Sequence, residues 1–337
     1  MSKPTFRDPD LPQSGDASAQ PGASSVPDQV IEAYEIKVQQ LEPLDTGSHN
    51  NHFRIESDAG TFDLRRSVEP TSPENLRYEA ELLHHVRCNG FTLGPEIFVA
   101  RDGNPNVWSD GVGWTLFHWA GDGSRVQRQS LTSERTCHAA RALADLHLAA
   151  SDFHPTVGRG GSPVFAVPED WFEQWMGRAA LLADNLGAEG ADFLALAQRS
   201  ADEMNSLNVR DLPRTVCHGD YRPANLRFDG GTVATVFDFD VAFISSRLLD
   251  LGGATTRFST LGGVPHAEIE SAGLFLKSYD AQFPLADSEW GALPAFIRWR
   301  LIRDIVVYFD RWWDHVKATC NALFSGTAED MVAAARA

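Results

Sequence analysis

The chain has 337 residues, of which 43% are hydrophobic and 22% charged, so it is long enough for one large or two medium domains. Its formal net charge of −17 argues against general nucleic-acid binding and is compatible with a cationic substrate. The four cysteines are scattered without a CxxC pair, so we predict neither a zinc site nor a disulfide framework. No apolar run has the length of a signal peptide or a membrane span, and we expect a cytoplasmic protein without a membrane partner.

The N-terminal third is predicted to begin with a disordered leader over residues 1–28, because it is rich in Ser, Pro and Gly. A short helix at Val30–Tyr34 and a strand at Ile36–Leu41 should follow. Alternating residues then predict a hairpin whose tip is Asp58–Gly60 and whose second strand is Thr61–Arg65.

The turn before this hairpin contains Gly47, Ser48 and Asn50. Backbone N–H groups in such a turn can bind the phosphates of a nucleotide. The turn lacks the GxGxxG pattern of protein kinases, and a plain hairpin loop explains the same residues.

A helix is predicted over Ser72–Val86, since Pro suits the first turn and apolar residues recur at helical spacing. Glu79 falls on the apolar face of this helix, where a carboxylate needs a partner. Arg65 is the candidate, and the two look like the cation and glutamate that hold nucleotide phosphates in kinases. Arg66 competes for this role, although strand alternation should turn it to the other face.

Two further strands are predicted at Pro95–Val99 and Trp114–Trp119, and beyond residue 123 the pattern becomes mainly helical. We expect helices at the following ranges: 131–150, 168–185, 190–207, 269–283 and 293–323. Within them, His147 is interpreted as a core histidine. Trp171 and Trp175 could line a site for a cation or pack in the core.

The most informative stretch is His218–Gly219–Asp220, followed by Asn225 and by Asp238. Two short β-prone segments flank the turn Asp229–Gly231, so the chain should fold back and bring Asn225 and Asp238 together beside Asp220. Asn and Asp oxygens suit Mg²⁺, and Asp220 is left to accept a proton. This order of base, metal ligand and metal ligand is the one that phosphoryl transfer by kinases requires. An ordinary turn with a carboxylate at a strand end is the alternative.

The pattern of these residues resembles the signature sequence of the superfamily that contains aminoglycoside phosphotransferases, choline kinases and type II homoserine kinases. The resemblance implies that Asp220 is the catalytic base, that Asn225 and Asp238 bind Mg²⁺, and that Asp250 holds the backbone of the catalytic loop. It also implies phosphate binding by the turn at Gly47.

Several further contacts follow from the same resemblance. The backbone of Phe117 to Trp119 would bind adenine, although a buried aromatic strand explains these residues equally. Arg65 stands where many kinases have Lys, so the nucleotide geometry differs from the common pattern. Tyr221 and Asp240 are candidate substrate contacts, with Asp240 suited to an ammonium group. Independently of the resemblance, four residues of the last long helix could face the substrate or solvent: Asp304, Tyr308, Asp310 and Arg311.

The predicted fold is α+β and two-lobed, like that of protein kinases. A small antiparallel sheet with one helix occupies residues 29–120, and a larger, mainly helical lobe occupies residues 121–337. The predicted function is ATP- and Mg²⁺-dependent phosphorylation of a hydroxyl group on a small molecule. An amino alcohol, a homoserine-like amino acid and an aminoglycoside-like antibiotic are all compatible acceptors. A non-catalytic pseudokinase and a metal-dependent hydrolase are the alternatives.

Overall fold

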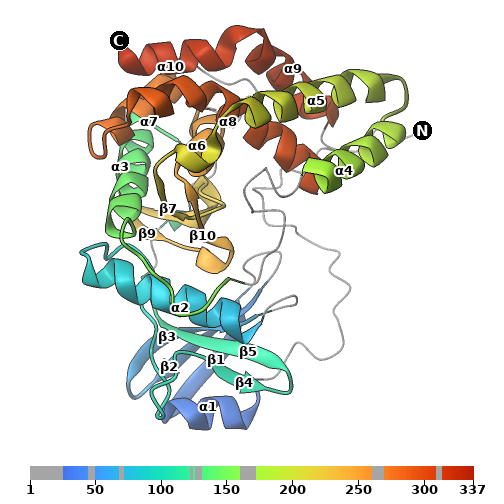
Figure 1. Cartoon of the computed structure of the whole chain (residues 1–337). Helices are drawn as coiled ribbons and strands as arrows, with labels where there is room; N and C mark the ends of the chain where they lie inside the picture. Colours follow the sequence, from blue (N-terminus) through green and yellow to red (C-terminus); the bar gives the residue numbers. More distant parts are fainter. Residues whose placement is uncertain are drawn as a thin grey trace. The chain divides into compact units, whose positions relative to one another are not determined.

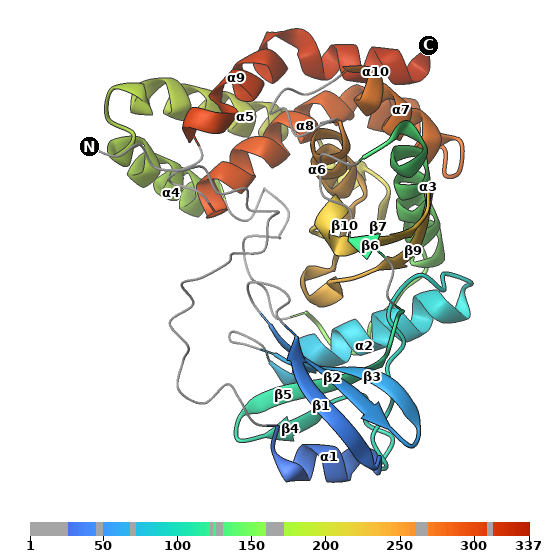
Figure 2. The same ribbon diagram turned by 180° about the vertical axis from the view of Figure 1, so that it is seen from behind.

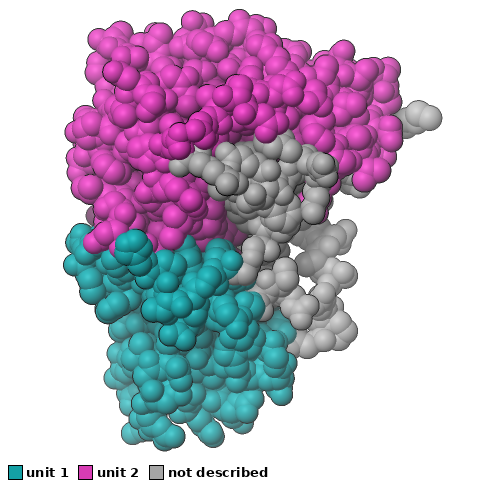
Figure 3. All heavy atoms as spheres, viewed as in Figure 1, with its two compact units in different colours: residues 1–123, 154–160 teal, residues 124–153, 161–337 magenta. Residues whose placement is uncertain are grey.

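The computed structural model describes residues 26–44, 50–67, 72–121, 124–125, 131–159, 172–259, 269–308 and 313–337. The chain divides into two compact units, one of residues 1–123 with 154–160 and the other of residues 124–153 with 161–337 (Figure 3). Most of the predicted leader lies outside the described residues. No helix in the described ranges is both long and apolar enough to cross a bilayer.

Unit 1 is built on an antiparallel sheet of five strands in the order β1-β2-β3-β5-β4 (Figure 1). Its elements are α1 (Asp28–Tyr34), β1 (Val38–Leu44), β2 (Asn51–Ser57), β3 (Gly60–Arg66), α2 (Pro73–Cys88), β4 (Val107–Ser109) and β5 (Val112–His118). The predicted hairpin is confirmed, because β2 pairs with β3 from Asn51↔Arg66 to Ser57↔Gly60.

The two faces of this sheet are covered by different helices, with α1 on one side and α2 on the other (Figures 1 and 2). Strand alternation assigns the side chains to these faces. Phe62 and Leu64 of β3 are fully buried in the core that contains Val30 and Tyr34 of α1. Arg65, the next residue after Leu64, therefore faces α2.

Helix α2 begins as predicted, since the Ser72 hydroxyl accepts a hydrogen bond from the Asn75 amide at 3.2 Å and Pro73 opens the first turn. The predicted strand at Pro95–Val99 is wrong. Within it only Ile97 forms an isolated bridge, to Phe117, because the segment follows the edge of β5 without a continuous ladder.

Unit 2 is mainly helical and carries two small antiparallel sheets, β10-β7 and β6-β8-β9. Its helices are α3 (Ser133–Ala149), α4 (Phe172–Asn185), α5 (Gly190–Ser206), α6 (Leu248–Phe258), α7 (Ile269–Asp280), α8 (Asp287–Tyr308), α9 (Trp313–Ala322) and α10 (Ala328–Arg336). Its strands are β6 (Ser124–Arg125), β7 (Arg214–Cys217), β8 (Leu226–Asp229), β9 (Thr232–Val236) and β10 (Phe243–Ser246).

The hairpin predicted around Asp229–Gly231 is present as β8 and β9, which pair from Leu226↔Val236 to Asp229↔Thr232. Gly230 has φ of 57°, a conformation that glycine adopts without strain. The fold is therefore α+β, with the antiparallel sheet and the helical region that the sequence predicted.

The C-terminal helices differ from the prediction of one helix over residues 293–323. Helix α8 begins earlier, at Asp287, and contains Pro294, whereas α9 is a separate helix. Gly326, with φ of 117°, breaks the helical conformation again before α10. Trp175 is buried against Trp299, with ring centroids 4.6 Å apart, so it packs in the core; Trp171 lies outside the described residues.

Candidate active site

The loop that follows β7 is fixed by the buried carboxylate of Asp250, in the first turn of α6. Asp250 Oδ2 accepts a hydrogen bond from the His218 amide at 2.5 Å, and Oδ1 accepts one from the Gly219 amide at 2.9 Å. Gly219 has φ of 87°, and a Cβ there would lie 2.7 Å from the Val241 carbonyl oxygen. Only glycine fits this position, and the predicted hold of Asp250 on the loop is confirmed.

Asp250 is itself supported by His147, a fully buried residue of α3. His147 Nε2 lies 3.0 Å from Asp250 Oδ2, and its Nδ1 lies 2.8 Å from the Tyr279 hydroxyl. Burial alone would raise the pKa of Asp250, but its bonds to His147 and to the Gly219 amide, with the nearby His218, hold this pKa below the ordinary value. Asp250 therefore stays ionised and keeps both backbone bonds.

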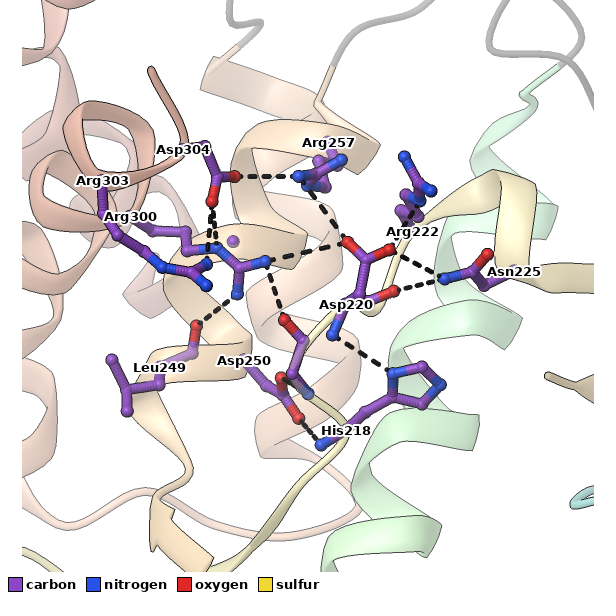
Figure 4. Close-up of polar contacts among 12 residues, drawn as sticks. His218, Asp220, Arg222, Asn225, Leu249, Asp250, Arg257, Arg300, Arg303 and Asp304 are labelled. Carbon is purple, nitrogen blue, oxygen red and sulfur yellow. Dashed lines mark hydrogen bonds and ion pairs between the residues drawn. The ribbon is translucent and has the colours of Figure 1, made fainter. Parts of the chain in front are cut away.

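The Asp220 carboxylate is partly exposed, at 22%, and is held on one side by Asn225 and Arg222 (Figure 4). Asn225 Nδ2 donates to the Asp220 carbonyl oxygen at 2.8 Å and to Oδ2 at 3.1 Å. Arg222 Nε lies 2.9 Å from the same Oδ2. Because Nδ2 is committed to Asp220, the Asn225 amide oxygen is the atom left to bind a cation.

On its other side Asp220 faces arginines from α6 and α8 (Figure 4). Arg257 Nη2 lies 3.8 Å and Arg300 Nη2 lies 3.9 Å from Asp220 Oδ1. Burial by itself would raise the pKa of Asp220, but Arg222, Arg257 and Arg300 outweigh it and lower the pKa below its ordinary value. Asp220 is therefore ionised at neutral pH.

Asp238 follows β9 and is brought beside Asn225 by the hairpin, because the Phe237 amide donates to the Asn225 carbonyl oxygen at 2.8 Å. Its backbone has φ of 70°, which is uncommon for a residue with a side chain and is found at functional sites. Burial, together with the charges of Asp240 and Asp220, raises the pKa of Asp238 well above its ordinary value. A cation bound at this position would favour the ionised carboxylate and so lower the pKa of Asp238.

His218 connects the loop after β7 to the segment that carries Asp238. Its Nε2–H donates to the Phe237 carbonyl oxygen at 2.7 Å, and its Nδ1 accepts a bond from the Asp220 amide at 3.3 Å. Burial lowers the pKa of His218, so the ring is neutral and makes both bonds. The structure thus brings together the three residues that the sequence singled out, at positions 220, 225 and 238.

In unit 1 the predicted pair of Arg65 and Glu79 is present. Arg65 Nη1 and Nη2 donate to the two Glu79 carboxylate oxygens at 2.8 and 2.5 Å, and both residues are buried. This bidentate geometry is specific to arginine, and the Phe117 ring lies 5.1 Å from the guanidinium carbon. Asn50 precedes β2, whereas Gly47 and Ser48 lie outside the described residues.

The backbone predicted to bind adenine already makes hydrogen bonds within unit 1. The His118 amide donates to the Glu96 carbonyl oxygen at 2.8 Å, and the Trp119 amide donates to Thr61 at 3.0 Å. Any adenine bond at these two residues must therefore use their carbonyl oxygens.

Two predicted substrate contacts have different surroundings. Tyr221 is 2% exposed, and its hydroxyl donates to the Ala139 carbonyl oxygen at 2.7 Å, which favours a structural role over a substrate contact. The apolar surroundings of its ring place it in the core of unit 2. Asp240 is partly exposed and lies beside Asp238.

Of the late helical candidates, Asp304 is buried and Tyr308 is the last residue of α8. Asp310 and Arg311 lie outside the described residues.

The sequence analysis missed the arginines around Asp220 and the support that His147 gives to Asp250. A signal was present, since Arg257 lies seven residues after Asp250 and therefore on the same face of α6. Arg300 carried no comparable signal, because its contact with the loop joins residues 81 apart.

Comparison with known proteins agrees with the resemblance seen in the sequence. Residues 40–283 match the model of the phosphotransferase enzyme family. Homoserine kinase of Methylocella silvestris is 24% identical over 288 residues, which cover 84% of each chain.

Among solved structures, the microcompartment-associated aminopropanol kinase is similar with a TM-score of 0.66 and 20% identity, over 90% of this chain and 97% of the other. An amicoumacin kinase in complex with AMP-PNP, Ca²⁺ and Ami gives a TM-score of 0.66 and 13% identity, over 90% and 93% of the two chains. These matches confirm the predicted kinase-like fold.

Proposed function

Because the chain belongs to the phosphotransferase enzyme family, we propose that it transfers the γ-phosphoryl group of ATP to a hydroxyl group of a small molecule. The observation that supports this most is the position of an ionised Asp220 beside Asn225 and Asp238, in a loop whose backbone is held by Asp250. Such a loop provides a base and cation ligands in fixed positions, which is what phosphoryl transfer needs.

In the proposed reaction Asp220 accepts a hydrogen bond from the acceptor hydroxyl and takes its proton. The hydroxyl oxygen forms a bond to the γ-phosphorus as the bond from that phosphorus to the bridging oxygen breaks, and ADP leaves. The lowered pKa of Asp220 keeps it in the form that can accept the proton. Asn225 orients the carboxylate through its bond to Oδ2.

Asn225 and Asp238 are the residues that would hold Mg²⁺. Among the residues that the structure describes, no group of three His, Cys, Asp or Glu side chains could hold a metal by itself. Mg²⁺ does not need such a group, since it binds through one or two protein oxygens together with phosphates and water. The raised pKa of Asp238 supports a cation there, and Mg²⁺ would neutralise charge on the phosphates when bound.

In unit 1 we assign Arg65, held by Glu79, to the phosphates of the nucleotide, with the turn at Gly47, Ser48 and Asn50 as a second phosphate contact. The fixed guanidinium supports this role, because arginine stays charged and binds phosphate oxygens. Within the stretch from Phe117 to Trp119, the carbonyl oxygens of His118 and Trp119 are the remaining candidates for adenine.

The acceptor is a hydroxyl compound of the kind that related kinases use. The similar proteins include homoserine kinases, an aminopropanol kinase and an amicoumacin kinase, which support an amino acid, an amino alcohol or an antibiotic as the acceptor. A pseudokinase would bind the nucleotide and transfer nothing, whereas a hydrolase would release phosphate from ATP without any acceptor.

These possibilities are separated by one set of measurements on the full chain. Thermal shift with ATP, with and without Mg²⁺, reports nucleotide binding, and ADP release is then measured over amino alcohols, hydroxy amino acids and aminoglycosides. We expect stabilisation by ATP with Mg²⁺ and ADP release that requires an acceptor. Nucleotide binding without ADP release in the presence of any acceptor would indicate a pseudokinase. ADP release at the same rate with and without an acceptor would indicate a hydrolase.

A further inference from the structure

Three buried polar side chains from three helices of unit 2 are joined by hydrogen bonds, and they are here called the polar chain: Tyr279, His147 and Asp250. All three are at most 1% exposed. Helix α7, which carries Tyr279, packs against both α3 and α6. At its other end the chain reaches the loop after β7, because Asp250 accepts hydrogen bonds from two backbone amides of that loop.

The charges of its members fix the protons of the polar chain. Asp250 is ionised and can only accept, so His147 Nε2, which lies 3.0 Å from Asp250 Oδ2, carries a proton. In the neutral ring Nδ1 is then an acceptor. Burial raises the pKa of Tyr279, so its hydroxyl keeps its proton and donates to this Nδ1 at 2.8 Å. Each nitrogen of the imidazole ring thus has one defined partner.

Tyr279 keeps the imidazole ring in the orientation that Asp250 needs. If the ring turned over, carbon atoms would face the carboxylate and both nitrogens would be unpaired in an interior closed to water. The His147 and Tyr279 rings meet edge to face, with centroids 5.7 Å apart. Without the hydroxyl, Nδ1 would be a buried acceptor with no donor, and the observed orientation would lose part of its advantage.

A second buried group holds the two ends of the polar chain at a fixed separation. Arg247, which precedes α6, donates from Nε and Nη2 to the two Glu289 carboxylate oxygens at 2.7 Å each. It also donates to the carbonyl oxygens of two residues that follow α7, at 3.2 and 2.7 Å. The start of α6, with Asp250, is therefore tied to the end of α7, with Tyr279.

We propose that Tyr279 and His147 are positioning residues for phosphoryl transfer, which hold the loop after β7 so that Asp220 is placed to orient the acceptor hydroxyl. The effect on kcat rests on the proposed kinase function. The bonds of both side chains lead to Asp250 and the loop backbone, and not to the Asp220 carboxylate. Displacement of a reacting group slows the chemical step, so loss of this hold should lower kcat and leave the KM values nearly unchanged.

Tyr279→Phe tests the first bond of the polar chain, because it removes the hydroxyl and keeps the ring. kcat should fall by about 2- to 10-fold, the effect of one hydrogen bond, and KM for ATP and for the acceptor should change by less than about 2-fold. ADP release with ATP, Mg²⁺ and the screened acceptor that reacts fastest measures these values. Tyr34→Phe is the matched control: Tyr34 is 3% exposed, donates to the Trp114 carbonyl oxygen at 3.4 Å in unit 1, and should leave kcat unchanged when replaced.

Two amides at position 147 separate the two bonds of the imidazole ring. Gln places its amide nitrogen near the position of Nε2 and can donate to Asp250, whereas Asn places it near Nδ1, on the side of Tyr279. His147→Asn should lower kcat by about 10- to 100-fold, the usual effect of removing a hydrogen-bond partner behind a functional group. His147→Gln should recover about 10-fold of this loss. Equal kcat values in the two variants would show that the donor to Asp250 is not needed.

Hydrogen–deuterium exchange reports the hold on the loop without any turnover. The His218 and Gly219 amides donate to Asp250, so they should exchange slowly as long as the loop is held. In Tyr279→Phe and in His147→Asn these two amides should exchange about 10-fold faster than in the wild type. Tyr34→Phe should match the wild type at both amides.

The possible results distinguish this inference from the proposed function. Wild-type kcat and wild-type exchange of the two amides in Tyr279→Phe and His147→Asn would overturn the inference. An equal fall in kcat in Tyr34→Phe, or a fall in kcat without faster exchange of the two amides, would also overturn it. If the folded wild type releases no ADP with any acceptor, the proposed function fails, and the exchange of the two amides then decides by itself whether Tyr279 and His147 hold the loop.

Discussion

Asp220 owes its ionised state to charges that come from different parts of unit 2. Arg222 is two residues away in the loop, whereas Arg257 and Arg300 come from α6 and α8. Together they outweigh the burial that would protonate the carboxyl. In the proposed reaction Asp220 orients the acceptor hydroxyl for attack on the phosphorus and accepts its proton.

Asp220→Asn tests this role at the residue scale. The amide keeps the shape and cannot accept the proton, so kcat should fall by about 10²- to 10⁴-fold, the usual contribution of a general base. ADP release with the best acceptor measures this loss, and thermal shift with ATP and Mg²⁺ should show that nucleotide binding remains. Asp229→Asn, at the exposed turn of the β8–β9 hairpin, is the matched control and should keep full activity. An Asp220→Asn enzyme as fast as the control would exclude Asp220 as the base.

At the scale of elements, the site depends on the close approach of α6 and α8. Gly252 and Gly253 of α6 make this approach possible. A Cβ on Gly252 would lie 2.5 Å from the Phe296 carbonyl oxygen, and one on Gly253 would lie 2.9 Å from Arg300 Nη1. Glycine at these positions thus allows Arg300 to reach the Gly219 carbonyl oxygen in the loop after β7.

Gly252→Ala should separate the two helices and destabilise unit 2. Overpacking against backbone atoms costs about 1–3 kcal/mol, which exceeds the gain of up to about 1 kcal/mol from replacing a helical glycine. Gly291→Ala in α8 is the control, because nothing lies within 4 Å of a Cβ there, and it should be neutral or stabilising. Urea denaturation of the two variants measures the difference. Equal midpoints would show that α6 and α8 do not need this contact.

Over the whole molecule, carboxylates with shifted pKa values respond to pH in opposite directions. Asp250 and Asp304 have pKa values below the ordinary value of about 3.9, because hydrogen bonds and positive charges outweigh their burial. Their stabilisation is therefore present above about pH 4 and is lost as the pH falls further. Asp238 has a raised pKa, so its ionised form destabilises the fold at high pH, and this penalty disappears as the pH falls towards about 4.

We expect the melting temperature to fall steeply only below about pH 4. Asp238→Asn should melt at a higher temperature than the wild type at pH 8, because it removes repulsion from Asp240 and Asp220. This difference in melting temperature should shrink as the pH is lowered. Addition of ATP with Mg²⁺ should raise the melting temperature of the wild type and not that of the variant. Melting curves from pH 8 to pH 3.5 measure both effects. A constant difference between the two proteins at every pH would contradict the raised pKa.

The sequence by itself determined the local arrangement of the site. The β8–β9 hairpin and the pair of Arg65 and Glu79 follow from short-range turn chemistry, strand alternation and helical spacing, whereas the hold of Asp250 on the loop was implied only by the family resemblance. The roles of Asp220, Asn225 and Asp238 remain proposals, as do the predicted domain boundaries.

Only the tertiary structure decided what surrounds Asp220. The ion pair of Arg257 with Asp304 joins α6 and α8 across 47 residues of sequence, and a contact at that separation leaves no periodic signal. The same reason explains why the return of residues 154–160 to unit 1 and the burial of Tyr221 escaped the sequence analysis. Local patterns fix which residues share a turn or a helical face, whereas packing between distant elements fixes which charged groups surround Asp220.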